Sequence, residues 1–320
     1  MAGSTPASLT AEPPVPAAPA EAKAGRSGAS FSPGLEAWRR FRRHRLAVVS
    51  ALVLLFMVLA VAVGPLVWRV AINDIDFSAQ LQGPSWSHPL GTDDLGQDVL
   101  ARLLYGGRIS LAVGLCAMLV AATVGVLVGA VAGMSRGSID AGLMWLADLF
   151  LSLPQFPLLL MIIYFFRGAL TGLVGVELGL FIMIVAVIGG LRWMQVARLV
   201  RAQILSIREK EFIEAARALG AGKVRQVVRH ILPNALGPVI VAGTIDVAAA
   251  IITESTLSFL GLGFPPDVPS WGRMLFDAKD TLDVAPHWAM FSGAAIFITV
   301  LAINFIGDGL RDALDPRRVL

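Results

Sequence analysis

Six apolar segments, each long enough to cross a lipid bilayer, constrain this chain more than any other feature. A helix of about 20 apolar residues spans the roughly 30 Å of hydrocarbon in a membrane, and a helix satisfies its own backbone hydrogen bonds there. Only 15% of the 320 residues are charged, against about 25% in soluble domains. The sequence therefore predicts an all-α integral membrane protein with six transmembrane helices. The predicted spans are Leu46–Trp68, Ile109–Gly133, Leu143–Phe166, Leu178–Met194, Leu236–Leu260 and Trp288–Ile306.

Two of these spans are irregular. The third contains Pro154 and Pro157, which predict a kink because proline removes a helix hydrogen bond. The fourth is the shortest, and its cytoplasmic end is hard to define because Arg192 and Arg198 resemble flanking residues that extend toward the membrane surface.

The distribution of Lys and Arg predicts the orientation. With the N-terminus inside, 20 of these residues fall in cytoplasmic segments and 6 in outer segments. Positive residues accumulate on the cytoplasmic side of membrane proteins. Both termini and the loop after the fourth span are therefore expected in the cytoplasm.

The ends of the chain differ in composition from its middle. Residues 1–37, rich in Ala and Pro, are expected to form a disordered cytoplasmic tail. Five arginines between Trp38 and Arg45 directly precede the first span, so they indicate a membrane anchor rather than a nucleic-acid site. Residues 38–108 hold the first span and an outer segment, and 311–320 form a cytoplasmic C-terminus. The one cysteine, Cys116, lies in an apolar run and supports neither a disulfide nor a metal site.

The cytoplasmic stretch Ser206–Asn234 predicts a short helix, a glycine turn and a second helix. Ser206 and Glu209 form a capping box, so the first helix is expected to begin at about Ile207. Its apolar stripe comprises Phe212, Ala216 and Leu219. Gly220 fits a left-handed C-terminal cap, and the second helix, from Lys223 to Leu232, is expected to stop at Pro233.

Paired small residues in the first of these helices favour close contact with another protein. Ala215 and Ala216 would let two backbones approach, and Glu214 could pair with a partner's arginine. Together with Gly220, Leu232 and Pro233, these residues resemble the EAA loop of ABC importer permeases, although His230 stands where that motif has Ile. The resemblance implies a coupling helix that docks on an ATPase subunit. The alternative is an ordinary surface helix-turn-helix.

Two outer segments extend the resemblance. His88, Asp93, Asp94 and Asp98 could suggest a metal site, but their spacing fits neither an EF-hand nor a zinc pattern. The stretch 88–108 instead resembles the C-type permease of dipeptide, oligopeptide and nickel importers, with Gln97 where that family usually has Arg. The segments 257–272 and 304–317 also resemble it. The likeness runs from about Arg39 to Arg318 and implies a type I ABC importer permease fold, with the ABC transmembrane domain at 109–310.

Three carboxylates lie within predicted spans. Asp148, Asp246 and Glu254 would each cost about 2.5 to 3.5 kcal/mol at the centre of a bilayer, so they are expected to face the bundle interior or water. They could line the route of a substrate, or they could form hydrogen bonds between helices. Both interpretations stay open at this point.

The resemblance implies a function that this chain cannot perform alone. The sequence has no G-x-x-x-x-G-K-[ST] run to bind ATP, so it is not expected to be an enzyme or to hold a cofactor or a metal. The family implies four kinds of partner: a second homologous permease, two ATPase subunits that bind ATP and Mg²⁺, an extracytoplasmic solute-binding protein, and the bilayer of a bacterial inner membrane. Peptides are the expected substrate, with nickel, glutathione and oligosaccharides as alternatives.

Two other classes of membrane protein compete with this hypothesis. A proton-coupled secondary transporter could use Asp246 and Glu254 as relays, but it would not need the Glu-Ala-Ala loop, and the sequence lacks an inverted repeat of broken helices. An intramembrane hydrolase would need a nucleophile–base pair, and no histidine lies within a predicted span.

Overall fold

The computed structural model describes residues 33–314. Most of the predicted N-terminal tail and the last six residues lie outside this range. The tail boundary at residue 37 is wrong by a few residues, because the first helix already begins at Pro33. Within the described residues the chain forms helices and no strand, apart from one isolated bridge between Thr92 and Asp98.

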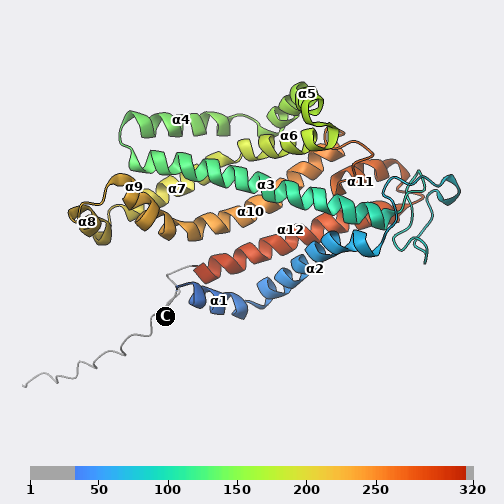
Figure 1. Cartoon of the computed structure of the whole chain (residues 1–320), viewed down its shortest axis with the longest axis horizontal. Coiled ribbons are helices and arrows are strands. Elements are labelled where there is room, and N and C mark those ends of the chain that lie inside the picture. Colours follow the sequence, from blue (N-terminus) through green and yellow to red (C-terminus); the bar gives the residue numbers. More distant parts are fainter. Residues whose placement is uncertain (1–32, 315–320) are drawn as a thin grey trace, which may run out of the picture.

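The molecule is an elongated bundle (Figure 1) in which α2, α3, α10 and α12 run along the long axis. Its helices are α1 (Pro33–Arg43), α2 (Arg45–Val67), α3 (Val99–Met134), α4 (Ser138–Ser152), α5 (Gln155–Val174), α6 (Val176–Gly190), α7 (Trp193–Ile207), α8 (Glu211–Ala218), α9 (Lys223–Gln226), α10 (Leu232–Phe259), α11 (Trp271–Ala278) and α12 (Pro286–Leu314). A π-helical turn (Val227–Ile231) joins α9 to α10, and 3-10 turns occur at Phe77–Ala79 and Lys279–Thr281.

Length and apolar composition confirm the all-α membrane fold. Five helical stretches of the described chain could cross a membrane: α2, α3, α5, α12 and the run Lys223–Phe259 that contains α10. The pair α6 and α7 is bent by 42° at a short break and makes a sixth span if it is counted as one. The predicted third span, Leu143–Phe166, is wrong as one helix, because the chain breaks before Pro154 into α4 and α5. Of these two helices only α5, Gln155–Val174, is long and apolar enough to cross a membrane.

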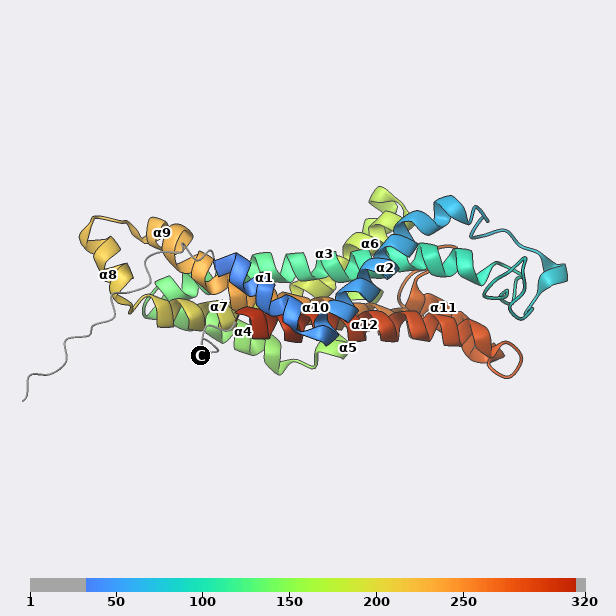
Figure 2. The same ribbon diagram turned by 90° about the horizontal axis from the view of Figure 1, so that it is seen from below.

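The segments that the charge pattern assigns to the same side of the membrane lie near the same end of the bundle. The segments expected inside, namely α1, the α8–α9 region and the end of α12, lie in the same half of the long axis, with α8 and α9 at its tip (Figures 1 and 2). The segment between α2 and α3 and helix α11 lie at the other end. The grouping agrees with one consistent topology, and which end faces the cytoplasm stays a prediction.

Glycines on one face of α3 form a close helix contact with α7. Gly125, Gly129 and Gly133 are spaced four apart and face α7. A Cβ atom built on Gly129 would lie 2.5 Å from the carbonyl oxygen of Ala197, and one on Gly133 would lie 2.9 Å from Cβ of Ile204. Small residues allow such close approach of membrane helices. These glycines, the α3–α7 seam below, hold α7 against α3.

A buried arginine holds the outer segments together. Arg102 is 2% exposed, and its guanidinium lies 3.5 Å from the Asp93 carboxylate and donates to the backbone oxygen of Pro266 at 2.8 Å. Asp98 caps α3 by accepting from the backbone of Ala101 at 2.7 Å. Its other oxygen lies 2.9 Å from His88 Nδ1. The acidic residues of this segment therefore serve local structure, and the described residues contain no group of three or more potential ligands placed to hold a metal.

The topology can be tested with two single cysteines in a Cys116→Ser background. Ser87 and Ser206 are both exposed. Ser87 belongs to the segment between α2 and α3, and Ser206 belongs to the last turn of α7, which leads into α8 at the opposite end of the bundle. We expect an impermeant maleimide to label Ser87→Cys in intact spheroplasts and Ser206→Cys only after lysis. Buried Ala197→Cys is the unreactive control. The opposite labelling pattern would invert the topology.

The α3–α7 seam can be tested by filling it. We expect Gly129→Val to destabilise the protein by roughly 1–3 kcal/mol, because its side chain would overlap the backbone of α7. Gly168→Val is the matched control, since this glycine also lies within a helix and a Cβ there meets nothing within 4 Å. Thermal unfolding in detergent measures both. Equal melting temperatures for the two variants would show that the seam is not a tight contact.

Candidate functional site

Helix α8 and the turn after it form the tip of the bundle at the predicted cytoplasmic end (Figure 2). The predicted start of this helix is wrong, because α7 continues through Ser206 to Ile207 and α8 begins only at Glu211. Ile204 and Ile207 explain the difference, since both are buried in the cluster that also contains Ile213. Their packing extends α7 past the apparent capping box, and Lys210, at the N-cap of α8, makes no side-chain capping bond.

One side of α8 is anchored and the rest is exposed. Ile213 is fully buried, whereas Glu214 and Ala215 are exposed and Ala216 is half-buried. The predicted stripe does not face the protein, because Phe212 is 44% and Leu219 is 90% exposed. Phe212 and Leu219 therefore lie on the exposed surface of the tip. The carboxylate of Glu214, in the same helix, has no ion-pair partner among the described residues. Apolar surface of this kind is typical of a protein interface.

Gly220 ends α8 in the left-handed conformation that the sequence predicts. Its φ is +84°, and the backbone N–H of Ala221 donates to the carbonyl oxygen of Ala216 at 3.0 Å. The N–H of Gly220 itself donates to the oxygen of Arg217 at 2.9 Å. These two bonds make a Schellman cap, which favours glycine because a side chain is strained at this φ.

Pro233 does not end the following helix, contrary to expectation. It lies in the first turn of α10, and helical structure runs through it from Lys223 to Phe259. The π-helical turn before it changes the hydrogen-bond register, so that the N–H of Leu232 donates to the oxygen of Val227. The side-chain amide of Asn234 donates to the oxygen of His230 at 2.6 Å. Leu232 and Pro233 therefore link the tip directly to a membrane helix.

Asp246 in α10 is buried and ion-paired across helices. Arg192, at the break between α6 and α7, donates to its Oδ1 from Nη2 at 2.7 Å and from Nε at 3.1 Å. Arg192 is therefore not a free flanking side chain, because it pairs with a carboxylate in the middle of α10. Pairing offsets the cost of placing either charge in an apolar bundle. The Arg192–Asp246 ion pair connects the break between α6 and α7 to α10.

Asp148 and Glu254 have different surroundings. Asp148 in α4 is exposed and pairs with Arg198 of α7. Glu254 in α10 is fully buried and accepts from Ser258 Oγ at 2.8 Å and from Ser110 Oγ at 3.1 Å. Ser110 also accepts from the backbone N–H of Trp271 at 3.2 Å. Glu254 thus joins α10, α3 and α11, and its place on a substrate route stays a prediction.

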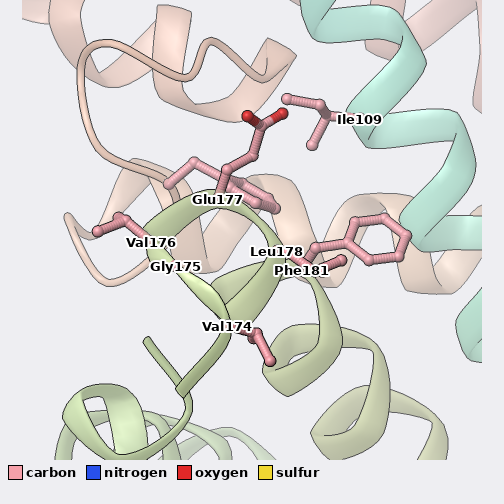
Figure 3. A pocket seen from close by; sticks show the side chains of 8 residues that line it. Ile109, Val174, Gly175, Val176, Glu177, Leu178 and Phe181 are labelled. Carbon is pink, nitrogen blue, oxygen red and sulfur yellow. The ribbon is translucent and has the colours of Figure 1, made fainter. Parts of the chain in front are cut away.

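A cavity of about 390 Å³ lies where α5 meets α6, toward the predicted outer end of the bundle. It is lined mainly by apolar side chains of α3, α6 and the loop after α10, and Glu177 is its one acidic member (Figure 3). Glu177 Oε1 accepts a hydrogen bond from the hydroxyl of Tyr105 at 2.9 Å. None of the three predicted pathway carboxylates lines this cavity.

Two features of the site went unrecognised in the sequence. Glu177 is the only charged residue between Arg167 and Arg192, which was an available signal for an outer polar position. The pairing of Arg192 with Asp246 had a weaker signal, namely two opposite charges within consecutive apolar regions.

Comparison with known proteins identifies the family. Residues 125–319 match the binding-protein-dependent transport system inner membrane component family, and residues 32–84 match the N-terminal transmembrane domain of oligopeptide transport permease C. A protein of Brucella suis named as a peptide permease is 40% identical over 91% of this chain and 94% of its own length. The dipeptide transport system permease protein DppC of Alkalihalophilus pseudofirmus is 37% identical over 90% of this chain and 91% of its own.

The glutathione transport system permease protein GsiD of Pectobacterium atrosepticum is 39% identical over 89% of this chain and 92% of its own length. The family match extends over more than half of the chain, from the last third of α3 to residue 319. The chain therefore belongs to the binding-protein-dependent transport system inner membrane components and is a multi-pass permease subunit.

Proposed function

We propose that this chain forms half of the translocation pathway of an ATP-driven peptide importer. One observation carries the proposal: an exposed apolar tip, α8, is held by buried Ile213 between two helices that continue into the bundle. A second homologous permease would complete the pathway, and two ATPase subunits would bind ATP and Mg²⁺, one of them docking on α8. A solute-binding protein would deliver the cargo at the outer end. The chain itself would catalyse no reaction.

The geometry supports transmission of movement from the tip. α7 leads into α8, and the α9–α10 run leads away from it, so a displacement of α8 would act on both. The 42° break between α6 and α7 is a point where the backbone can bend, and the Arg192–Asp246 pair couples that point to α10. Movement of the ATPases would then tilt the inner halves of these helices and alternate access between the two sides.

The substrate proposal rests on the relatives. Proteins named for peptide, dipeptide and glutathione transport match this chain at similar identity, and glutathione is itself a small peptide. Peptides are therefore the proposed cargo. Nickel and oligosaccharides are the remaining alternatives within the same importer class, and the solute-binding protein would select among them. The charge distribution supports an inner-membrane orientation with both termini cytoplasmic.

The coupling role can be tested at the cap of α8. Gly220→Val should strain a residue at φ +84° by roughly 1–3 kcal/mol and so displace the end of the docking helix. We expect peptide uptake to fall at least about tenfold and ATP hydrolysis to lose its stimulation by loaded binding protein. Both are measured in the reconstituted complex, together with recovery of the ATPase subunits.

Gly222→Val is the matched control. Gly222 is also exposed and a Cβ there meets nothing within 4 Å, but its φ is −67°, which any residue adopts. Ala216→Trp and Glu214→Lys should reproduce the defect through bulk and through charge. Full peptide uptake and full stimulation of ATP hydrolysis in Gly220→Val, Ala216→Trp and Glu214→Lys would mean that α8 is a passive linker.

The pathway role of Glu254 has a separate test. Glu254→Gln retains an acceptor for Ser258 and a side chain of nearly equal volume, so the protein should insert and assemble. If the carboxylate contributes to the route, the KM or kcat for uptake should change by different factors for cationic, neutral and anionic peptides. Unchanged kinetics for every peptide would restrict Glu254 to holding α10, α3 and α11 together.

A further inference from the structure

A large basic cavity lies at the same end of the bundle as α8. Its volume is about 880 Å³, and it is formed by the turn between α3 and α4, the end of α7 and the turn between α8 and α9. Four cationic residues from these three segments line it: Arg136, Arg208, Arg217 and Lys223. No carboxylate is among its lining residues in the described part of the chain. Segments that are far apart in the sequence thus contribute cationic side chains to the lining of one cavity.

Most of this charge is not neutralised within the protein. Arg208 pairs with Glu209 and donates to the backbone oxygen of Gly133 at 3.1 Å. The nearby Asp140 is engaged by Arg201 through bonds of 2.5 and 2.7 Å. Among the described residues, by contrast, the other three cations of the lining form no ion pair. Several unpaired cations around one cavity are suited to a multivalent anion.

The rim of the cavity is apolar on one side. Val131, in the last turns of α3, is 52% exposed, and Ile139, at the start of α4, is 56% exposed. α3 is a predicted span and ends at Met134, so this rim lies where the apolar part of the bundle ends. A small inorganic anion would use the cations but not the rim. A ligand that carries both an anionic group and hydrocarbon would use both.

We propose that this cavity binds the headgroup of an anionic phospholipid of the inner leaflet. The phosphate oxygens accept from Arg136, Arg217 and Lys223, and the acyl chains lie over Val131 and Ile139 along α3 and α4. Basic pockets at the cytoplasmic ends of membrane helices suit headgroups with more than one phosphate, such as that of cardiolipin. Because two of the cations flank the cap of α8, a bound lipid would also hold the tip in place.

The test measures lipid binding by the complex purified with its native partners. Native mass spectrometry counts the lipids retained after titration with cardiolipin or with phosphatidylcholine. We expect cardiolipin to bind at least about tenfold more tightly than phosphatidylcholine. Each cation near a membrane surface contributes about fivefold in affinity, so Arg136→Gln with Lys223→Gln should weaken cardiolipin binding about 25-fold. Ile139→Asn should also weaken it.

The matched control is Arg225→Gln with Arg229→Gln. These two arginines are exposed in the same segment but do not line the cavity, so cardiolipin binding should stay within about twofold of the parent. Equal losses in the two double variants would show general surface attraction and overturn the proposal.

Two further outcomes would also overturn it. Competition by millimolar inorganic phosphate with no effect of Ile139→Asn would assign the cavity to a free anion. Loss of the ATPase subunits from the lining variant with unchanged lipid binding would assign the cations to that partner. The test does not involve transported cargo, so its result is independent of the proposed substrate.

Discussion

The contact between α3 and α7 is the interaction on which the other parts of this structure depend. In a bilayer, apolar side chains gain little by leaving lipid for another helix, so close packing has to hold helices together. Gly125, Gly129 and Gly133 supply that packing by admitting side-chain and backbone atoms of α7 into the space where a Cβ would otherwise lie. Since α7 leads directly into α8, the position of the exposed tip follows from this seam.

The buried charges act on the same helices. Arg192 and Asp246 are each costly in an apolar bundle and are compensated by each other, at a point where α6 and α7 bend by 42°. Glu254 has no cationic partner among the described residues and depends instead on serine hydroxyls from α3 and its own helix. These contacts connect the bent span, the long helix α10 and the outer helix α11. Asp246, one of the two carboxylates that could act as a proton relay, is already paired to arginine and is therefore poorly suited to that role.

Features set by composition and by local backbone rules could be predicted from the sequence. The apolar segments other than the third, the interruption at Pro154 within that third segment, and the left-handed glycine at Gly220 agree with the structure. Predictions that depended on tertiary packing were wrong. Ser206 looked like a cap, but burial of Ile207 extends α7 past it. Pro233 looked like a stop, but a π-helical turn carries the chain through it. Asp246 could not be predicted as the partner of Arg192 without knowing which helices are neighbours.

The central claim is that this chain transports only as part of an ATP-driven complex. Liposomes containing the two permeases and the ATPase subunits, with solute-binding protein outside and ATP inside, measure it directly as uptake of a radiolabelled peptide. The account predicts uptake that needs internal ATP, binding protein and this chain together, and that persists when a protonophore collapses the pH gradient. Uptake by this chain alone, driven by a pH gradient and unaffected by removal of ATP, would contradict it.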